Sequence, residues 1–197
     1  MVYRRFSKHF SRLNLSLQPG WCAVSVPLEQ LAQKHGARIE KRTNYHALVV
    51  EPDRIREVVA ELKNTGYDYL LSISGVDEPD AKRIRIVYHF ARSSNPGDVV
   101  AVETVVPRDE PVIDSIHDVY PAALLHEREE HEMLGIVFRG NPDSRHLLLP
   151  EDWPEGVYPL RKDFKVVEES HMSTKPSKPV WILKPELKPK DEGEEKA

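Results

Sequence analysis

Two histidines and four glutamates gather between residues 126 and 132, and these side chains have the clearest potential for chemistry. A zinc-protease helix needs two histidines four residues apart, so that both imidazoles lie on one face. His126 and His131 are five residues apart, about 140° around a helix. His126 with Glu130, or Glu127 with His131, would still lie one turn apart. The spacing therefore disfavours a zinc site and leaves metal binding as the weaker alternative.

The same glutamates could act as general acids or bases, but a run of charges on a helix is more often a solvated face. Leu125, Glu129 and Met133 recur at helical spacing, and Arg128 lies beside them. A stripe that mixes apolar and charged residues is typical of a protein–protein interface, where Arg–carboxylate pairs fix the register. We therefore predict partner binding. A stand-alone enzyme that uses this cluster, or a binding module for a peptide or small acid, is the less favoured alternative.

The chain offers no sequence signal for a cofactor. Its single cysteine, Cys22, cannot form an internal disulfide or hold an iron–sulfur cluster, and a small buried apolar role is expected for it. The nine glycines form no phosphate-binding loop, and no nucleophile elbow or nicotinamide fingerprint is present. We predict that the chain binds no cofactor or metal and has no catalytic site of its own.

Composition narrows the class of partner. The net charge is −4 with both signs mixed, which argues against nucleic acid, since that partner usually requires a basic excess. Hydrophobic residues make up 40% of the 197 residues, enough for one domain with a real core. No apolar run approaches the ~20 residues that cross a bilayer. The basic start of the chain is expected to touch a partner or lipid head groups, with a targeting peptide as the alternative.

Apolar periodicity and turn residues predict a series of helices and antiparallel strands. Helices are expected at 27–36, 52–66 and 121–134, the last ended by Gly135. Strands are expected at 38–42, 45–51, 67–76, 83–92 and 99–107, with turns at 77–82 and 95–98. The fold class is α+β, an antiparallel or mixed sheet with two to three packing helices, followed by an irregular, extended C-terminal arm.

Four segments differ in character. Residues 1–20 form an N-terminal arm, 21–111 the α+β domain, 112–164 a helix with a partner-docking segment, and 165–197 an extended tail rich in proline and charge. The tail contains the apolar run Val180-Trp181-Ile182-Leu183. Because exposed Trp-Ile-Leu is unfavourable, we expect this run to dock on a neighbouring subunit, or alternatively on its own domain.

Residues 126–164 carry a family resemblance. After Met133, Leu134, Gly135 and Ile136 the chain continues with Gly140-Asn141-Pro142-Asp143-Ser144-Arg145 and closes with Tyr158-Pro159-Leu160-Arg161-Lys162-Asp163-Phe164. This pattern resembles the signature of the 30 kDa (C) subunit family of NADH:quinone oxidoreductase. Leu134 stands where that family usually has an aromatic residue, and Asn141 where it has histidine. Residues 147–157 look more like the versions in energy-converting membrane hydrogenases and related archaeal complexes.

The resemblance implies a non-catalytic scaffold subunit in the peripheral arm of a membrane-bound complex I-like oxidoreductase, which couples electron transfer to ion translocation. The implied partners are a hydrogenase-like large subunit and iron–sulfur protein subunits, at the cytoplasmic face of the membrane or, alternatively, on the mitochondrial matrix side. The same role in a membrane-bound nickel–iron hydrogenase or sulfur reductase is the alternative. The residues expected at the partner interface are Glu127, Arg128, Glu129, Met133, Gly135, Phe138, Arg145, Trp153, Arg161, Lys162, Asp163, Phe164 and Trp181.

Overall fold

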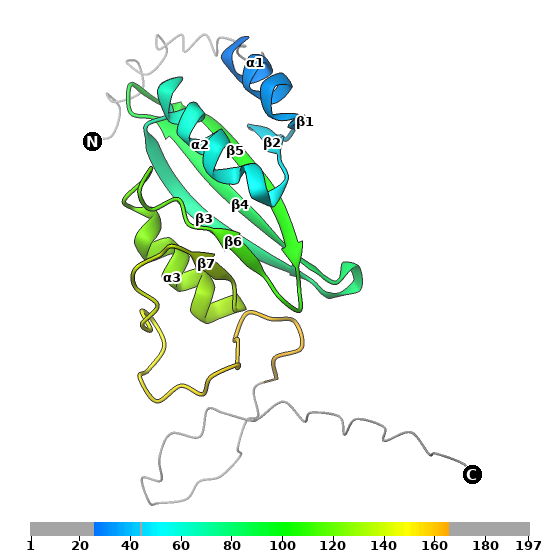
Figure 1. Cartoon of the computed structure of the whole chain (residues 1–197), viewed down its shortest axis with the longest axis vertical. Coiled ribbons are helices and arrows are strands. Elements are labelled where there is room, and N and C mark those ends of the chain that lie inside the picture. Colours follow the sequence, from blue (N-terminus) through cyan, green and yellow to red (C-terminus); the bar gives the residue numbers. More distant parts are fainter. Residues whose placement is uncertain (1–25, 44, 166–197) are drawn as a thin grey trace, which may run out of the picture.

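The main feature of the computed structural model, which describes residues 26–43 and 45–165, is a five-stranded mixed sheet (Figure 1). Its strands lie in the order β1-β2-β5-β4-β3, in which β2 and β5 are parallel and the other neighbours antiparallel. The bounds are β1 Arg38–Lys41, β2 His46–Val49, β3 Tyr69–Glu78, β4 Arg83–Arg92 and β5 Asn95–Pro107. The predicted α+β class is confirmed.

Among the described residues, three α-helices and a second, small sheet accompany the large sheet. The helices are α1 Val26–His35, α2 Ile55–Asn64 and α3 Ala123–Leu134, with 3-10 turns at Pro52–Arg54 and Pro79–Ala81. The small parallel sheet pairs β6 Val112–Asp114 with β7 Val137–Arg139. The sequence pattern predicted neither of these strands, because three residues are too few to show a period.

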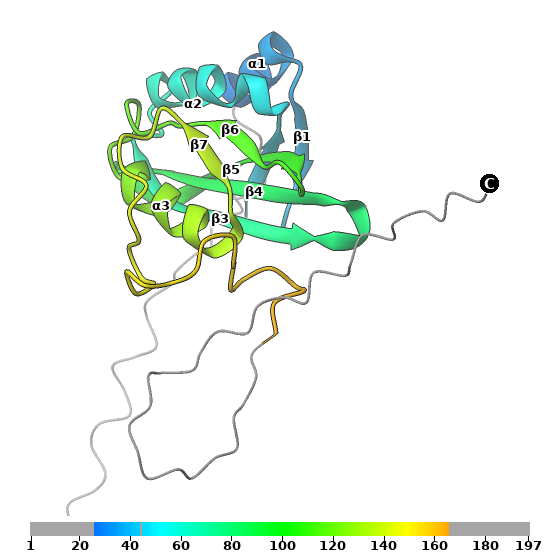
Figure 2. The same ribbon diagram turned by 60° about the horizontal axis from the view of Figure 1, so that its bottom comes forward.

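One face of the large sheet carries the hydrophobic core. The α2 residues Ile55, Val58, Val59 and Leu62 recur at helical spacing and are all fully buried against the sheet. Figure 2 shows α1 and α2 lying along this face. The core continues through Ile113, Ile116, Ala123, Leu134 and Ile136. Residues on both sides of position 111 therefore share one core.

Two predicted boundaries were wrong at the hairpins. The turn expected at 95–98 lies at Ser93 and Ser94 instead, and Asn95 already pairs with Arg92. Asp98 accepts hydrogen bonds from Tyr67 and Arg92, which fixes these turn-type residues inside a strand. Strand β3 also continues two residues beyond its expected end, through Asp77 to Glu78.

Candidate interaction surface

Helix α3 buries acids on its core-facing side. Its buried stripe consists of Ala123, Glu127, Glu130 and Leu134, which recur every three or four positions. Gly75 of β3 makes this packing possible, since a Cβ atom there would overlap both the Leu134 side chain and the Glu130 carboxylate. The charged face is thus partly internal, contrary to the usual expectation for a run of acids.

Glu127 fastens two loops to the helix. Its carboxylate accepts hydrogen bonds from the Ser115 hydroxyl at 2.5 Å, the Ile116 N–H at 2.8 Å and the Asn141 amide at 2.8 Å. Burial raises the pKa of Glu127, and these three donors oppose the shift. In the chain by itself the Glu127 side chain is fully buried and its acceptors are used internally, so its place at a partner interface stays a prediction.

Glu130 is buried with fewer hydrogen bonds. Among the described residues its carboxylate accepts one hydrogen bond, from the Gly75 N–H at 2.9 Å, and burial raises its pKa to about 7. The Tyr88 hydroxyl is also fully buried and has no hydrogen-bond partner in the same part of the chain. Burial, and then the negative charge of Glu127 and Glu130, raises the pKa of Tyr88. An ionised Glu130 is therefore unfavourable in the folded chain.

Glu132 orders the loop that follows β7. Its carboxylate accepts the N–H groups of Leu147 at 3.0 Å, Leu148 at 2.8 Å and Leu149 at 3.3 Å. Burial favours a higher pKa, but these donors and His146 outweigh it, so the pKa of Glu132 is lowered. The loop backbone is thus held against α3 by a buried carboxylate.

Arg128 reinforces the same loop. Its guanidinium donates to the carbonyl oxygens of Arg145 at 3.0 Å and His146 at 2.9 Å, and lies 3.2 Å from the Asp143 carboxylate. Arg145, which is largely exposed, also pairs with Asp143. Two charged residues of α3, Glu132 and Arg128, therefore fix residues 143–149 from opposite ends.

The segment from Tyr158 to Phe164 packs on the C-terminal end of α3. The Leu160 N–H donates to the Met133 carbonyl at 3.0 Å, and the Arg161 guanidinium donates to the Leu134 carbonyl at 2.8 Å. Arg161 also lies over the Tyr158 ring, which in turn covers Gly135. The family segment is thus attached to the helix cap of its own domain.

A buried carboxylate on β3 holds the end of that segment. Asp77 accepts two hydrogen bonds from the Arg108 guanidinium, at 2.7 and 3.0 Å, and one from the Lys162 N–H at 2.8 Å. The exposed Asp163 accepts a hydrogen bond at 2.9 Å from Arg108 Nη2, the nitrogen that also binds Asp77. The guanidinium lowers the pKa of Asp77. The sequence pattern placed Asp77 in a turn and gave no sign of this contact.

Two further residues expected at the interface are internal. Phe138 of β7 belongs to the hydrophobic core, and Trp153 is largely buried. Trp153 donates its indole N–H to the Val157 carbonyl at 2.8 Å and lies 6.4 Å, between ring centroids, from half-buried Phe164. Both side chains are buried in the chain by itself, and their contact with a partner stays a prediction. Trp181 lies outside the described residues.

Gly135 allows the helix to end beneath the Tyr158 ring. Its φ of +79° is left-handed, and a Cβ atom there would overlap that ring. We expect Gly135→Ala to lower the free energy of unfolding by about 3 kcal/mol, through backbone strain and overlap. Gly140→Ala is the matched control, since φ is +91° but nothing lies within 4 Å, and should cost about 1 kcal/mol. Equal losses in urea unfolding would contradict the packing argument.

The ordered loops present apolar side chains outward. Leu125, Leu147, Leu148 and Leu160 are all exposed, Leu148 to 60%. Half-buried Glu129 and Met133 lie on the same outward stripe of α3 as Leu125. We call these six residues the α3 surface. Exposed Lys162 and Arg145 lie on the segments that border it.

The histidines of α3 do not converge on a common ligand. His131 donates from Nδ1 to the Ile136 carbonyl at 2.9 Å. Within residues 26–43 and 45–165, no three His, Cys, Asp or Glu side chains are arranged to hold a metal ion. None of the helices described is long and apolar enough to cross a membrane.

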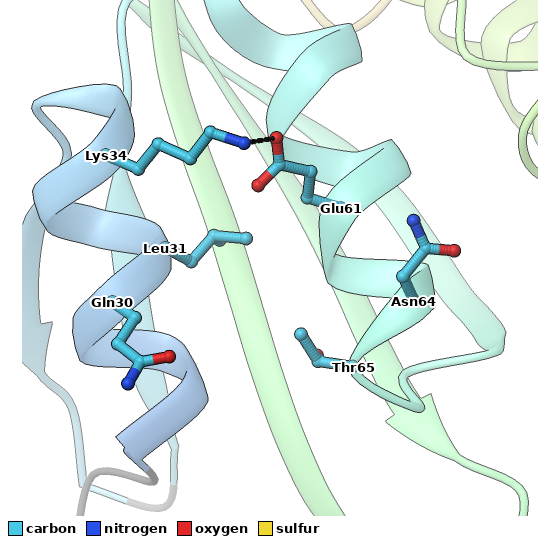
Figure 3. A pocket seen from close by; sticks show the side chains of 6 residues that line it. All are labelled: Gln30, Leu31, Lys34, Glu61, Asn64 and Thr65. Carbon is cyan, nitrogen blue, oxygen red and sulfur yellow. Dashed lines mark hydrogen bonds and ion pairs between the residues drawn. The ribbon is translucent and has the colours of Figure 1, made fainter.

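A groove of about 520 Å³ lies elsewhere, between α1 and α2 (Figure 3). Lys34 and Glu61 form an ion pair across it, and Leu31 contributes an apolar side chain. The remaining lining residues are Gln30, Asn64 and Thr65. Of the residues predicted for the partner interface, those that the structure describes do not line this groove.

Fold and surface together define the described residues as a two-layer α+β domain whose Tyr158–Phe164 segment packs on helix α3. The family model described as respiratory-chain NADH dehydrogenase, 30 Kd subunit, matches residues 48–170. The chain belongs to this family, as the sequence resemblance predicted.

Relatives carry the names of several complexes. The chain is 40% identical over 117 residues to the C subunit of F(420)H(2) dehydrogenase from Methanosarcina mazei, covering 59% of this chain and 73% of that protein. It is 42% identical over 105 residues to the C subunit of NADH-quinone oxidoreductase from Chloroherpeton thalassium. This match covers 53% of this chain and 42% of that protein. The beta subunit of the membrane-bound hydrogenase from Pyrococcus furiosus is 47% identical over 74 residues, covering 38% and 43%. The match thus spans less than half the length of the last two relatives.

Two solved structures share the fold. A trypsin-resistant fragment (1-134) of Nqo5 gives a TM-score of 0.53 at 29% identity, covering 59% of this chain and 95% of the fragment. A chain of the membrane-bound sulfane sulfur reductase (MBS), an archaeal respiratory membrane complex, gives a TM-score of 0.63 at 30% identity. This match covers 70% of the present chain and 83% of the reductase chain.

Proposed function

We propose that this chain is a structural subunit of the peripheral arm of a membrane-bound oxidoreductase complex. In this role it docks through the α3 surface on a hydrogenase-like large subunit, beside iron–sulfur subunits, on the cytoplasmic face of the membrane. The chain contributes no redox centre and supports electron transfer coupled to ion translocation. The observation that carries the proposal is a group of exposed leucines on a backbone fixed by Glu132 and Arg128.

Rigid exposed leucines favour binding of another protein. Leu147 and Leu148 have their backbone N–H groups bonded to Glu132, and Leu160 is bonded to the end of α3. A surface ordered before binding loses less conformational entropy when a partner docks. Apolar side chains gathered in this way gain free energy when a partner removes them from water.

Glu129 makes a basic side chain the preferred contact on a partner that docks on the α3 surface. It is half-buried on the outward side of α3 and is not paired with a basic side chain in the part of the chain that the structure describes. A carboxylate without a basic partner on the same helical stripe as exposed Leu125 favours an arginine or lysine on the partner, which would fix the register of docking. Arg145 and Lys162 extend the surface with positive charge.

We expect Glu129→Lys to reduce co-purification of the large subunit and the iron–sulfur subunits at least tenfold when the tagged chain is purified from membranes. Reversal places like charges against each other at the interface, and tenfold corresponds to about 1.4 kcal/mol. Leu148→Asp should reduce co-purification in the same way, because it places a charge among the exposed leucines of the α3 surface. Mass spectrometry of the purified material measures both.

Glu57→Lys is the matched control, because Glu57 is an exposed helical glutamate on α2, away from the α3 surface. It should leave co-purification unchanged, and all three variants should unfold at wild-type urea concentrations. Recovery of the wild-type chain from membranes as a lone monomer would reject the scaffold role.

A hydrogenase or sulfur reductase complex is the second candidate. It is supported by similarity to the beta subunit of the membrane-bound hydrogenase and by the TM-score of 0.63 to a chain of the sulfane sulfur reductase complex. The same purification distinguishes the candidates, because the large subunit recovered identifies the complex. A nicotinamide-oxidising module among the recovered proteins would favour the NADH:quinone reductase.

A further inference from the structure

The second face of the five-stranded sheet carries no helix within the described residues. Side chains alternate between the two faces of a strand. On β4, Ile84, Ile86, Tyr88 and Phe90 enter the core, so Arg85, Val87 and His89 lie on the other face. Val87 packs there with Ala47 and Ala101 in a small separate cluster. We call this side the open sheet face.

Alternating charges cross the open sheet face in one continuous row. Each acid in the row contacts two arginines. Glu40 lies 3.2 Å from Arg38 and 3.1 Å from Arg42. Glu103 of β5 lies 2.8 Å from Arg42 and 3.8 Å from Arg85.

The row ends on the β3–β4 hairpin. Glu78 lies 3.0 Å from Arg85 and 2.6 Å from Arg83. Seven side chains therefore run from β1 to the β3–β4 hairpin, in the order Arg38, Glu40, Arg42, Glu103, Arg85, Glu78, Arg83. On β2, which lies between β1 and β5, Ala47 of the same face is fully buried.

The arginines of this row are more exposed than its acids. The Glu103 side chain is 5% exposed and Glu78 22%, whereas Arg83 is 48% and Arg38 74% exposed. A guanidinium carries five N–H donors, more than one carboxylate uses. The outer layer of this face is therefore positively charged, while the carboxylates that hold it lie below.

Apolar side chains adjoin the arginines. Val76 and Val105 are the strand neighbours of Arg85 on either side, and both are exposed. Tyr69, opposite Ala91, is exposed on the same face. Guanidinium groups beside exposed valines and a tyrosine resemble the composition of protein interfaces, in which arginine and aromatic residues are enriched.

We propose that the open sheet face is a second interaction surface, which binds an acidic, partly apolar surface of another protein subunit. Four arginines and three glutamates leave a net charge of only +1 in the row, too small an excess to hold a phosphate polymer or an anionic membrane. Carboxylates from a protein can instead bind the outward N–H groups while apolar groups cover Val76 and Val105.

This surface is distinct from the α3 surface. Helix α3 packs through Leu134 and Glu130 on the core side of Gly75, whereas the row of charges lies on the opposite side of the sheet. The chain can therefore contact two proteins at once, which goes beyond docking on one large subunit.

The experiment places a photoreactive benzoylphenylalanine at Val105 in the full chain, and in parallel at Leu148, and irradiates intact membranes. We expect Val105 to give a covalent adduct with another subunit, through a peptide rich in Asp or Glu. An adduct of Val105 only with lipid, with nucleic acid or within the same chain would overturn the proposal. So would the absence of any Val105 adduct. The Leu148 adduct tests the docking function separately, so either surface can fail alone.

Charge-reversal variants provide a second test of the open sheet face. Arg38→Glu combined with Arg83→Glu should lower the yield of the Val105 adduct at least fivefold and leave the Leu148 adduct unchanged. Arg54→Glu is the matched control, because Arg54 is about as exposed as Arg83 and also pairs with one glutamate, but lies on the helical side. An unchanged Val105 adduct in the double variant would overturn the proposed charge complementarity.

Discussion

Asp77→Ala is expected to lower the free energy of unfolding by about 3–5 kcal/mol, because it removes the buried carboxylate of Arg108 and leaves that guanidinium only the exposed Asp163. The Asp77 side chain is fully buried, and Arg108 is only 15% exposed. Alanine also removes the acceptor for the Lys162 N–H. Urea unfolding of the chain measures the loss. Limited proteolysis should cut the Tyr158–Phe164 segment faster in this variant, since its attachment to β3 is gone.

Asp163→Ala is the matched control for Asp77→Ala. Both carboxylates bind Arg108, but the Asp163 side chain is 69% exposed. An exposed ion pair contributes about 0–1 kcal/mol, so the loss should be small. Similar losses in the two variants would show that burial of Asp77 is not what stabilises the segment.

The sequence predicted the elements whose hydrophobic pattern is complete. Helix α2 shows Ile55, Val58, Val59 and Leu62 on one stripe, and β4 places its large core residues from Ile84 to Phe90 at every second position. Local spacing alone defines both. The ends of α3 were also nearly right, because Gly135 has the left-handed φ that terminates a helix.

The orientation of α3 could not be predicted in the same way. Positions 123, 127, 130 and 134 have helical spacing, but two of them are glutamates, which hides the buried stripe in a hydrophobicity pattern. Their donors come from Ser115, Ile116 and Gly75, which no local pattern links to the helix. Only the assembled fold shows that these carboxylates have partners.

The contacts on the open sheet face could not be predicted from local patterns either. Arg42, Glu103 and Arg85 are far apart in sequence, and their contact depends on the strand order β1-β2-β5-β4-β3 and its registers. The sequence pattern predicts several of these strands but does not order them. It does predict the outward Leu125, Glu129 and Met133 stripe, because those three positions follow the helical period of a single element.

Glu130→Gln is expected to stabilise the chain at pH 8 and to have little effect below pH 4.5. Folding raises the pKa of Glu130 from 4.5 to about 7, mainly through burial. Between these values the folded chain binds more protons than the unfolded chain, so stability falls as pH rises from about 4.5 to 7. The difference corresponds to on the order of 3 kcal/mol. Glutamine keeps an oxygen for the Gly75 N–H and removes the charge.

Glu132 lies two residues further along α3, and its pKa shifts in the opposite direction to that of Glu130, so Glu132→Gln is expected to have the opposite effect on stability. Folding lowers the pKa of Glu132, so its contribution is present above pH 4.5 and is lost as pH falls through the folded value. Urea midpoints at pH 5 and pH 8 should therefore separate the two variants: the Glu130→Gln difference from wild type changes between these pH values, whereas the Glu132→Gln loss is present at both. Relative to wild type, Glu130→Gln gains stability as pH rises, and Glu132→Gln is less stable at pH 8. A Glu130→Gln difference that does not change with pH would show that this buried carboxyl is ionised at no cost to the fold, and would remove the basis for treating α3 as sensitive to pH.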